Sequence, residues 1–217
     1  MSFRLGVFGL LIITLLGCQG TNPVYDTFKW ILPSSPSAMQ LSPAFEFMVV
    51  GLDGRSTVLA LGERSKQLLP EGLETHEYWY SSQHEMLHLV NGRIHQALGF
   101  TVEWRSQEST APRWSEVQKA RYEVPWSRVL NIMPGYRYGQ VDHLWVKPAK
   151  RASNNPLGVP TGVQWFEESV VSQTADARPW AYQQRFAVLN DQVVYSEQCL
   201  SPKICLSLRP LGVERRP

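Results

Sequence analysis

The chain has few of the residues and motifs that indicate catalysis. It contains three cysteines in 217 residues and has no C-x-x-C, no G-x-S-x-G and no glycine-rich phosphate-binding loop. It also has no long basic run, and its formal net charge is +2. These absences argue against a dithiol redox site, a serine-hydrolase elbow, a nucleotide-phosphate site and nucleic-acid binding. The sequence predicts no catalytic residue, no bound metal and no cofactor.

The chain also lacks the roughly 20 consecutive apolar residues that a membrane-spanning helix needs. The run from Leu5 to Leu16 holds about a dozen residues behind Arg4, which is typical of a secretory signal. It ends in Leu15-Leu16-Gly17-Cys18, which resembles the bacterial lipobox, whose cysteine is lipidated and becomes the new N-terminus. Gln19 follows, rather than the Asp of an inner-membrane retention signal. We therefore expect palmitate-type lipidation of Cys18 and an outer-membrane lipoprotein on the periplasmic face.

This signal sets the expected domain organisation. Residues 1–17 are the expected signal peptide, and residues 18–44 the expected lipid anchor, short helix and tether. Residues 45–211 are expected to form one β-rich periplasmic domain, followed by a frayed tail over residues 212–217.

The two remaining cysteines are Cys199 and Cys205. An even pair in an oxidising compartment favours a disulfide. Two free buried thiols are the alternative.

Short strand-like runs separated by turn residues fill the domain. Asn91-Gly92 lies between Glu85–Val90 and Arg93–Leu98 and is the strongest hairpin signal in the chain. Residues 66–74 contain a proline and a glycine and are interpreted as a connecting loop, and residues 110–121 as a short helix. About ten short strands and one or two helices predict an all-β domain, either a strongly curved antiparallel sheet or an incomplete barrel.

One motif points to a different function. His84-Glu85-Met86-Leu87-His88 matches the H-E-x-x-H signature of zinc proteases, which needs both imidazoles on one face of a helix. The surrounding residues predict a strand, in which residues four apart are separated by roughly 13 Å. A turn at Asn91-Gly92 predicts that His88 faces His95 across a hairpin, which is more often a solvent-facing pair than a metal site. Zinc proteolysis is therefore the less favoured hypothesis.

Aromatic residues are abundant, with eight each of Trp, Tyr and Phe. Four tryptophans are candidates for glycan or partner contacts, because indole rings stack on sugars: Trp79, Trp104, Trp165 and Trp180. Core packing is the competing explanation for each of them.

Several of these segments together resemble one family, the YjbF/GfcB lipoproteins of exopolysaccharide and group 4 capsule operons. The likeness lies in the lipobox and in a set of strand and turn segments: Phe47 to Gly54, Tyr78-Trp79-Tyr80-Ser81, Val90-Asn91-Gly92-Arg93-Ile94, Gly99-Phe100, Trp180 to Phe186, and Val193 to Gln198 followed by Pro202. The two C-terminal cysteines and Phe186, where a Trp is more usual, depart from the family pattern.

The resemblance implies a β-rich periplasmic lipoprotein, similar to the half-barrels of lipoprotein carriers. It implies partners among exopolysaccharide or capsule secretion proteins, including an outer-membrane barrel, and contact with the polysaccharide itself. No catalytic residues come with the family, so a non-enzymatic binding role in export is the favoured hypothesis. A lipid or lipoprotein carrier with an apolar concave face is the alternative.

Overall fold

The computed structural model describes residues 41–70, 72–150, 156, 158–173 and 179–211. Cys18, the expected helix before residue 33 and the expected C-terminal tail lie outside the described residues. Within the described part, no helix is both long enough and apolar enough to cross a membrane.

The described residues form an all-β domain with one short helix, as predicted. The elements in chain order are β1 (Phe47–Leu52), β2 (Arg55–Leu69), β3 (Gly72–Tyr80), β4 (Met86–Val90), β5 (Arg93–Leu98), β6 (Glu103–Ser109), α2 (Trp114–Lys119), β7 (Val124–Met133), β8 (Arg137–Ala149), β9 (Gln164–Gln173), β10 (Trp180–Leu189), β11 (Gln192–Ser201) and β12 (Ile204–Pro210).

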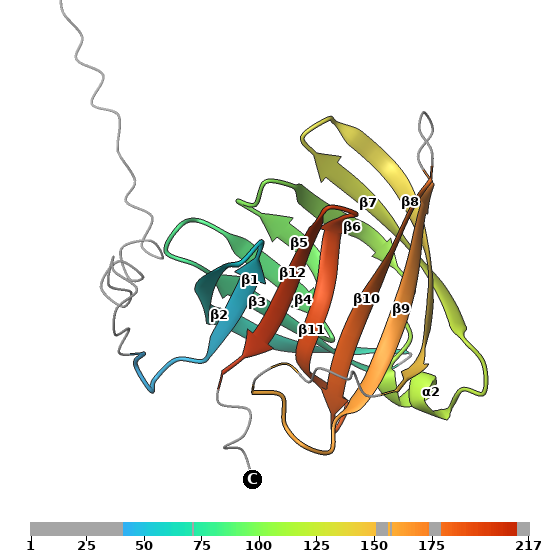
Figure 1. Ribbon diagram of the computed structural model, residues 1–217, viewed down its shortest axis with the longest axis horizontal. Coiled ribbons are helices and arrows are strands. Elements are labelled where there is room, and N and C mark those ends of the chain that lie inside the picture. The colour runs from blue at the N-terminus through green and yellow to red at the C-terminus, as the bar shows by residue number, and fades with distance from the viewer. Residues whose placement is uncertain (1–40, 71, 151–155, 157, 174–178, 212–217) are drawn as a thin grey trace, which may run out of the picture.

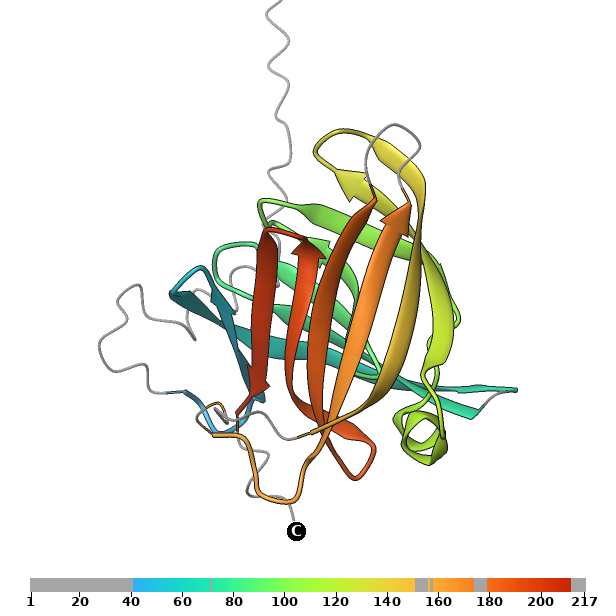
Figure 2. The same ribbon diagram turned by 45° about the vertical axis from the view of Figure 1, so that its right-hand side comes forward.

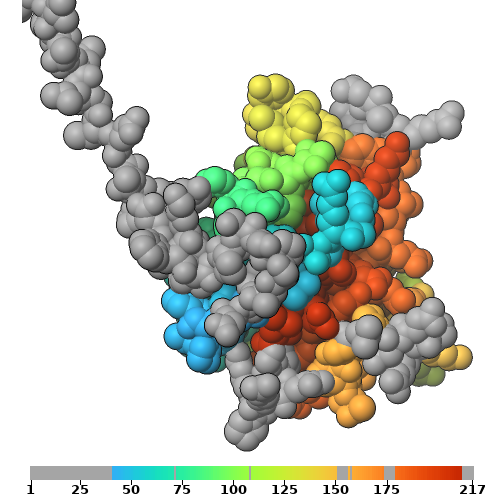
Figure 3. Space-filling view, turned by 60° about the vertical axis from the view of Figure 1, so that its left-hand side comes forward, coloured from blue at the N-terminus to red at the C-terminus, as the bar shows by residue number. Residues whose placement is uncertain are grey.

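The twelve strands form a closed antiparallel barrel in which each strand pairs with its neighbours in sequence (Figure 1). The first and last strands close it, with Val50 of β1 facing Leu208 of β12. Figure 3 shows the blue start and the red end of the barrel side by side on the surface. The sheet is thus curved as predicted, but it closes fully instead of remaining an open sheet or an incomplete barrel. Closure removes both exposed strand edges.

The two ends of the barrel differ in what they carry. We call the end at which β1 begins the proximal end. Because successive strands alternate in direction, the β2–β3 and β4–β5 turns and α2 also lie at this end (Figure 2). The β1–β2 and β7–β8 turns lie at the opposite end, which we call the distal end.

The prediction of a connecting loop over residues 66–74 is wrong. β2 continues to Leu69 and β3 begins at Gly72, so these residues form a long two-stranded arm. Ser65, Lys66 and Gln67 are exposed on successive positions, so neither face of the arm is continuously apolar. The alternation that identifies a half-buried strand is therefore missing here, although the backbone pairing is regular.

Apolar side chains fill much of the barrel in two principal clusters. The larger one includes Trp79, Leu87, Leu89, Ile94 and Trp104 together with residues of β1, β2, β7, β11 and β12. The second cluster lies around Trp114 and Trp126 and reaches β8, β9 and β10. Trp114 of α2 packs against Phe166 and Phe186, with ring centroids 5.2 and 4.8 Å away, and so covers the proximal end of this cluster.

Candidate functional site

The barrel wall is weakest between β5 and β6. These strands share only the pairs Gln96–Arg105 and Ala97–Trp104, whereas β8 and β9 pair along residues 141–149 and 165–173. The pairing of β4 with β5 shifts register at His95, and such a bulge bends its strand. We call the resulting gap the β5–β6 seam.

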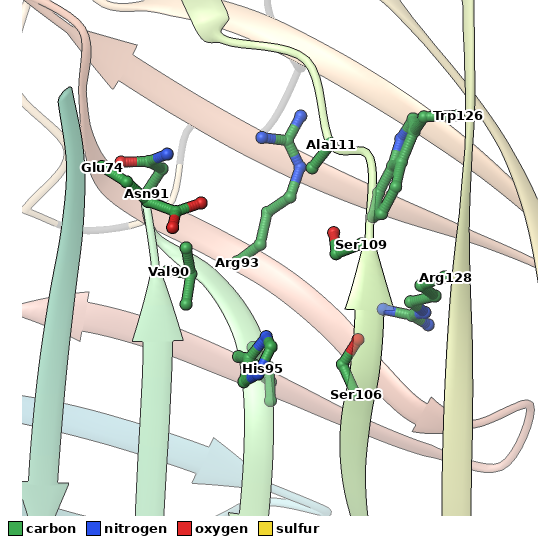
Figure 4. A pocket seen from close by; sticks show the side chains of 11 residues that line it. Glu74, Val90, Asn91, Arg93, His95, Ser106, Ser109, Ala111, Trp126 and Arg128 are labelled. Atoms are coloured by element: carbon green, nitrogen blue, oxygen red, sulfur yellow. The ribbon is translucent and has the colours of Figure 1, made fainter. Parts of the chain in front are cut away.

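The β5–β6 seam contains a small pocket (Figure 4). Arg93 and His95 of β5, Ser106 of β6, and Trp126 and Arg128 of β7 contribute to its lining. Its volume is about 20 Å³, enough for about one water molecule. A sugar ring or an acyl chain does not fit in a space of this size.

Arg93 lines the pocket in the seam and is 5% exposed. Its Nε donates to Glu168 Oε1 at 3.3 Å, and its Nη1 donates to the Pro112 carbonyl at 3.1 Å. Its guanidinium carbon lies 3.7 Å from the centroid of the Trp114 ring. Burial lowers the pKa of Arg93, and Glu168 opposes this change. The side chain therefore joins β5 to β9 and to the segment before α2.

Glu168 is the centre of a buried group of donors. Its carboxylate accepts hydrogen bonds from Trp126 Nε1 at 3.0 Å and from Gln184 Nε2 at 2.9 Å, in addition to the one from Arg93. The side-chain Oε1 of Gln184 in turn accepts a hydrogen bond from the Cys199 backbone N–H at 3.1 Å. The carboxylate thus ties four strands of the barrel to one point.

A second buried ion pair lies nearby. Arg128 Nε donates to Asp142 Oδ2 at 2.9 Å, and Arg128 Nη2 donates to the Tyr182 hydroxyl at 3.0 Å. Ser172 donates to the other oxygen of Asp142 at 2.5 Å. Burial raises the pKa of Tyr182 to about 12, so its hydroxyl stays protonated. We call Arg93, Arg128, Asp142 and Glu168, with the groups bonded to them, the charged cluster.

The charged cluster is neutral overall, because it holds two arginines and two carboxylates. Each carboxylate is occupied by its arginine and by further donors, so neither is placed as a free acid or base for a reaction. Its contacts cross the barrel and fix one arrangement of the strands.

The zinc-protease motif does not form the helix that it needs. His84 lies in the turn before β4 with a positive φ of 70°, and His88 lies on β4 itself. Among the described residues, no group of three or more His, Cys, Asp or Glu side chains is arranged to hold a metal ion. The two imidazoles of the motif are therefore not presented as zinc ligands.

The predicted pairing of His88 with His95 is wrong in register. His88 faces Gln96, because the bulge displaces His95 from the ladder. The two rings still lie close, 4.9 Å apart between centroids, and His76 Nδ1 lies 3.0 Å from His88 Nε2. Burial, reinforced by His95, His76 and Arg105, lowers the pKa of His88 to about 4.

The four candidate tryptophans fall into different environments. Trp79, Trp104 and Trp165 are 1%, 3% and 3% exposed and are packed in the protein, which corrects the interpretation of these three as surface contacts. Trp180 is partly exposed at the distal end. The guanidinium of Arg137 lies 4.4 Å from the centroid of its ring.

Trp180 belongs to an aromatic group at the distal end. Tyr136 and Tyr138 flank Arg137 at the β7–β8 turn and are 72% and 67% exposed. We call Tyr136, Arg137, Tyr138 and Trp180 the distal aromatic patch. The two tyrosines were not among the candidates from the sequence, although their spacing in Tyr136-Arg137-Tyr138 beside a Pro-Gly turn is a usable signal for exposed aromatic residues.

The structure contains the predicted disulfide between the two C-terminal cysteines. Cys199 of β11 and Cys205 of β12 face each other and form a disulfide. The disulfide joins the two strands of the last hairpin, and β12 is also the strand that closes the barrel against β1.

The fold and the site together define a small closed barrel whose interior is filled by apolar side chains and by a charge-balanced cluster. The sequence matches the family described as group 4 capsule polysaccharide lipoprotein GfcB, YjbF over residues 34–208. The chain belongs to this family, which confirms the resemblance noted in the sequence. Members are capsule-associated lipoproteins, and the family is not a known enzyme family.

One solved structure supports the fold independently. The hypothetical lipoprotein YmcC from Escherichia coli (K12) superposes with a TM-score of 0.58 and 19% sequence identity, covering 81% of this chain and 86% of that chain. No curated protein sequence matches the chain.

Proposed function

We propose that this protein is a non-enzymatic component of capsule or exopolysaccharide assembly and export. Lipid on Cys18 holds it at the outer membrane, with the barrel in the periplasm. Membership of the capsule polysaccharide lipoprotein family supports the pathway, and the Leu15-to-Cys18 lipobox followed by Gln19 supports the anchor. Other secretion proteins, including an outer-membrane barrel, are the proposed partners.

The filled interior is the observation that favours an external binding surface. Apolar side chains and the charged cluster occupy the space inside the strands, and the pocket in the seam has room for about one water molecule. A carrier of acyl chains needs an apolar cavity of several hundred Å³. A larger hollow of about 480 Å³ lies at the β1–β2 turn, but it is open to solvent and its lining includes Asp53, Arg55 and Glu197. The lipid-carrier alternative is therefore disfavoured.

The distal aromatic patch is the proposed contact surface for polysaccharide. Two exposed tyrosines and a partly exposed tryptophan provide flat rings for stacking on sugars, and Arg137 adds a positive charge beside them. Tyr122, which is 76% exposed at the proximal end, offers a matched exposed aromatic residue outside the patch.

Binding of the purified protein to the isolated capsular polymer tests this assignment. Replacing Trp180 by Ala removes one stacking platform and is expected to weaken binding by about tenfold, the equivalent of one good aromatic contact. Tyr136→Ala is expected to weaken binding as well, whereas Tyr122→Ala leaves it unchanged. Equal affinities for all four proteins would refute a glycan role for the patch and direct attention to a protein partner.

Deletion of the gene tests the pathway itself. We expect loss of surface polysaccharide under conditions where the operon is expressed, and restoration by the wild-type gene. Complementation by Cys18→Ala is expected to fail, because the barrel is no longer held at the membrane. Normal polysaccharide in the deletion strain would exclude the proposed function.

A further inference from the structure

The β2–β3 arm projects beyond the wall of the barrel at the proximal end (Figure 2). β1 pairs with β2 only as far as Ala60, and β4 pairs with β3 only from His76 onward. Residues 66–69 and 72–75 therefore pair only with each other in the sheet. Arg64 fixes the base of the arm through Glu46 at 2.8 Å and Glu77 at 2.7 Å.

The tip of this arm exposes apolar side chains that the barrel does not use. Leu68 faces Leu73 across the two strands, and these side chains are 80% and 50% exposed. Cross-strand partners point to the same face of a ribbon, so the two leucines form one apolar surface. Lys66 lies two residues before Leu68 and points to the same face. Exposed leucines on a projecting ribbon favour association with another apolar surface.

The position of the arm indicates which apolar surface its leucines contact. The arm lies at the end where β1 begins, and Leu41 is the first residue described there. The chain from Cys18 to Leu41 covers 23 residues and spans at most about 80 Å when fully extended. An anchor at Cys18 therefore joins the barrel at the end that carries the arm, and the distal aromatic patch lies at the opposite end.

The composition and size of the arm tip favour contact with lipid over contact with a second copy of the chain. Two leucines with a neighbouring lysine match a membrane interface, where apolar side chains enter the headgroup region and lysine meets anionic lipid. Two leucine side chains offer far less area than the roughly 1,200 Å² that a stable protein dimer buries. Phe45, 40% exposed just before β1, adds a further apolar group at the same end.

We infer that the tip of the β2–β3 arm docks into the surface of the membrane that carries the lipid anchor. This inference rests on the proposed lipidation of Cys18. Docking orients the barrel, so that its proximal end faces the lipid and its distal aromatic patch faces away. The tether alone permits many orientations, whereas a second contact restricts them.

Depth-dependent fluorescence quenching on proteoliposomes tests the inference with the full lipoprotein. Cys18 is expected to be acylated, and Cys199 and Cys205 form a disulfide, so an introduced cysteine is the free thiol for a fluorophore. The variants are Leu68→Cys in the arm and Tyr138→Cys at the distal end; both positions are well exposed, which protects folding. The vesicles contain phosphatidylethanolamine and phosphatidylglycerol, with a spin-labelled lipid as the quencher.

Quenching at position 68 is expected to exceed quenching at position 138, and Leu73→Ser in the Leu68→Cys background is expected to reduce it. Flotation of the vesicles is measured first. If the protein floats but quenching is equal at the two positions, arm docking is wrong while the anchor stands. If the protein does not float, the proposed anchor is wrong and the inference falls with it.

Discussion

The larger apolar cluster and the charged cluster occupy the same barrel but hold it together in different ways. Around Trp79 and Leu87 the interior gains stability from non-directional burial of apolar surface. Around Glu168 and Asp142 it depends on particular donors meeting particular acceptors. The first arrangement tolerates exchange of side chains of similar volume, whereas the second fails when any one partner is removed.

The contrast also explains how the weak seam is closed. β5 and β6 provide few ladder hydrogen bonds, so another contact has to hold this part of the wall. Arg93 of β5 supplies it by reaching Glu168 on β9 and by stacking on Trp114 of α2. The charged cluster therefore compensates for missing strand pairing.

The largest expected difference between the two clusters comes from replacing Glu168, the centre of the charged cluster. Glu168→Leu leaves the Arg93 guanidinium, the Trp126 indole N–H and the Gln184 amide without their acceptor, all in buried positions. We expect a loss of about 3–5 kcal/mol in the free energy of unfolding, measured with urea. The double variant Arg93→Met/Glu168→Leu is expected to recover part of it, because no charge is then left unpaired. A loss below about 1 kcal/mol in the single variant would contradict the role given to the cluster.

The apolar cluster is expected to respond to volume rather than to chemistry. Leu87 is fully buried, so Leu87→Ala removes apolar contacts and leaves a cavity, with an expected loss of about 2–4 kcal/mol. Leu87→Met preserves volume and is expected to cost less than about 1.5 kcal/mol. Urea unfolding of both variants measures the difference. Similar losses for the two would mean that this cluster is as specific as the charged one.

The pH dependence of stability gives a third test, through a residue outside both clusters. This residue is His88, which lies on β4 between β3 and β5. In the folded protein its pKa is about 4, whereas an unfolded histidine titrates near 6.5. The unfolded chain therefore binds the proton first, so stability is complete above pH 6.5 and declines as the pH falls from 6.5 towards 4. At pH 5 the expected loss is about 2 kcal/mol, and it should be smaller in His88→Gln. An unchanged pH dependence in that variant would assign the acid sensitivity to other groups.

Local signals that act over a few residues predicted an all-β curved sheet or incomplete barrel, but they did not predict that β1 and β12 close it. Asn91 and Gly92 do adopt positive φ at the β4–β5 turn, as the dipeptide requires. The β2–β3 arm was missed because its residues face solvent and carry no alternation. The bulge at His95 was missed because a one-residue shift depends on the neighbouring strands rather than on the hairpin alone.

The charged cluster was not foreseen, although the sequence carries a signal for it. Arg128 lies between Trp126 and Leu130 at strand spacing, so a charge occupies a position that alternation assigns to the interior. Glu168 lies in the same way between Phe166 and Val170. Sequence alone does not say which opposite charge each will meet, because Arg93 and Glu168 are 75 positions apart.

The pairing of the first strand with the last also governs when the barrel is able to form. β1 gains its second neighbour only after β12, the last strand of the barrel, has been synthesised. Until then one edge of β1 offers unpaired backbone groups to any passing strand, and closing the ring brings together segments at opposite ends of the domain, which is slow. Synthesis of a chain that stops before residue 204 therefore ends in an open sheet with two unpaired edges, and such a fragment is a target for proteases rather than a shorter working barrel.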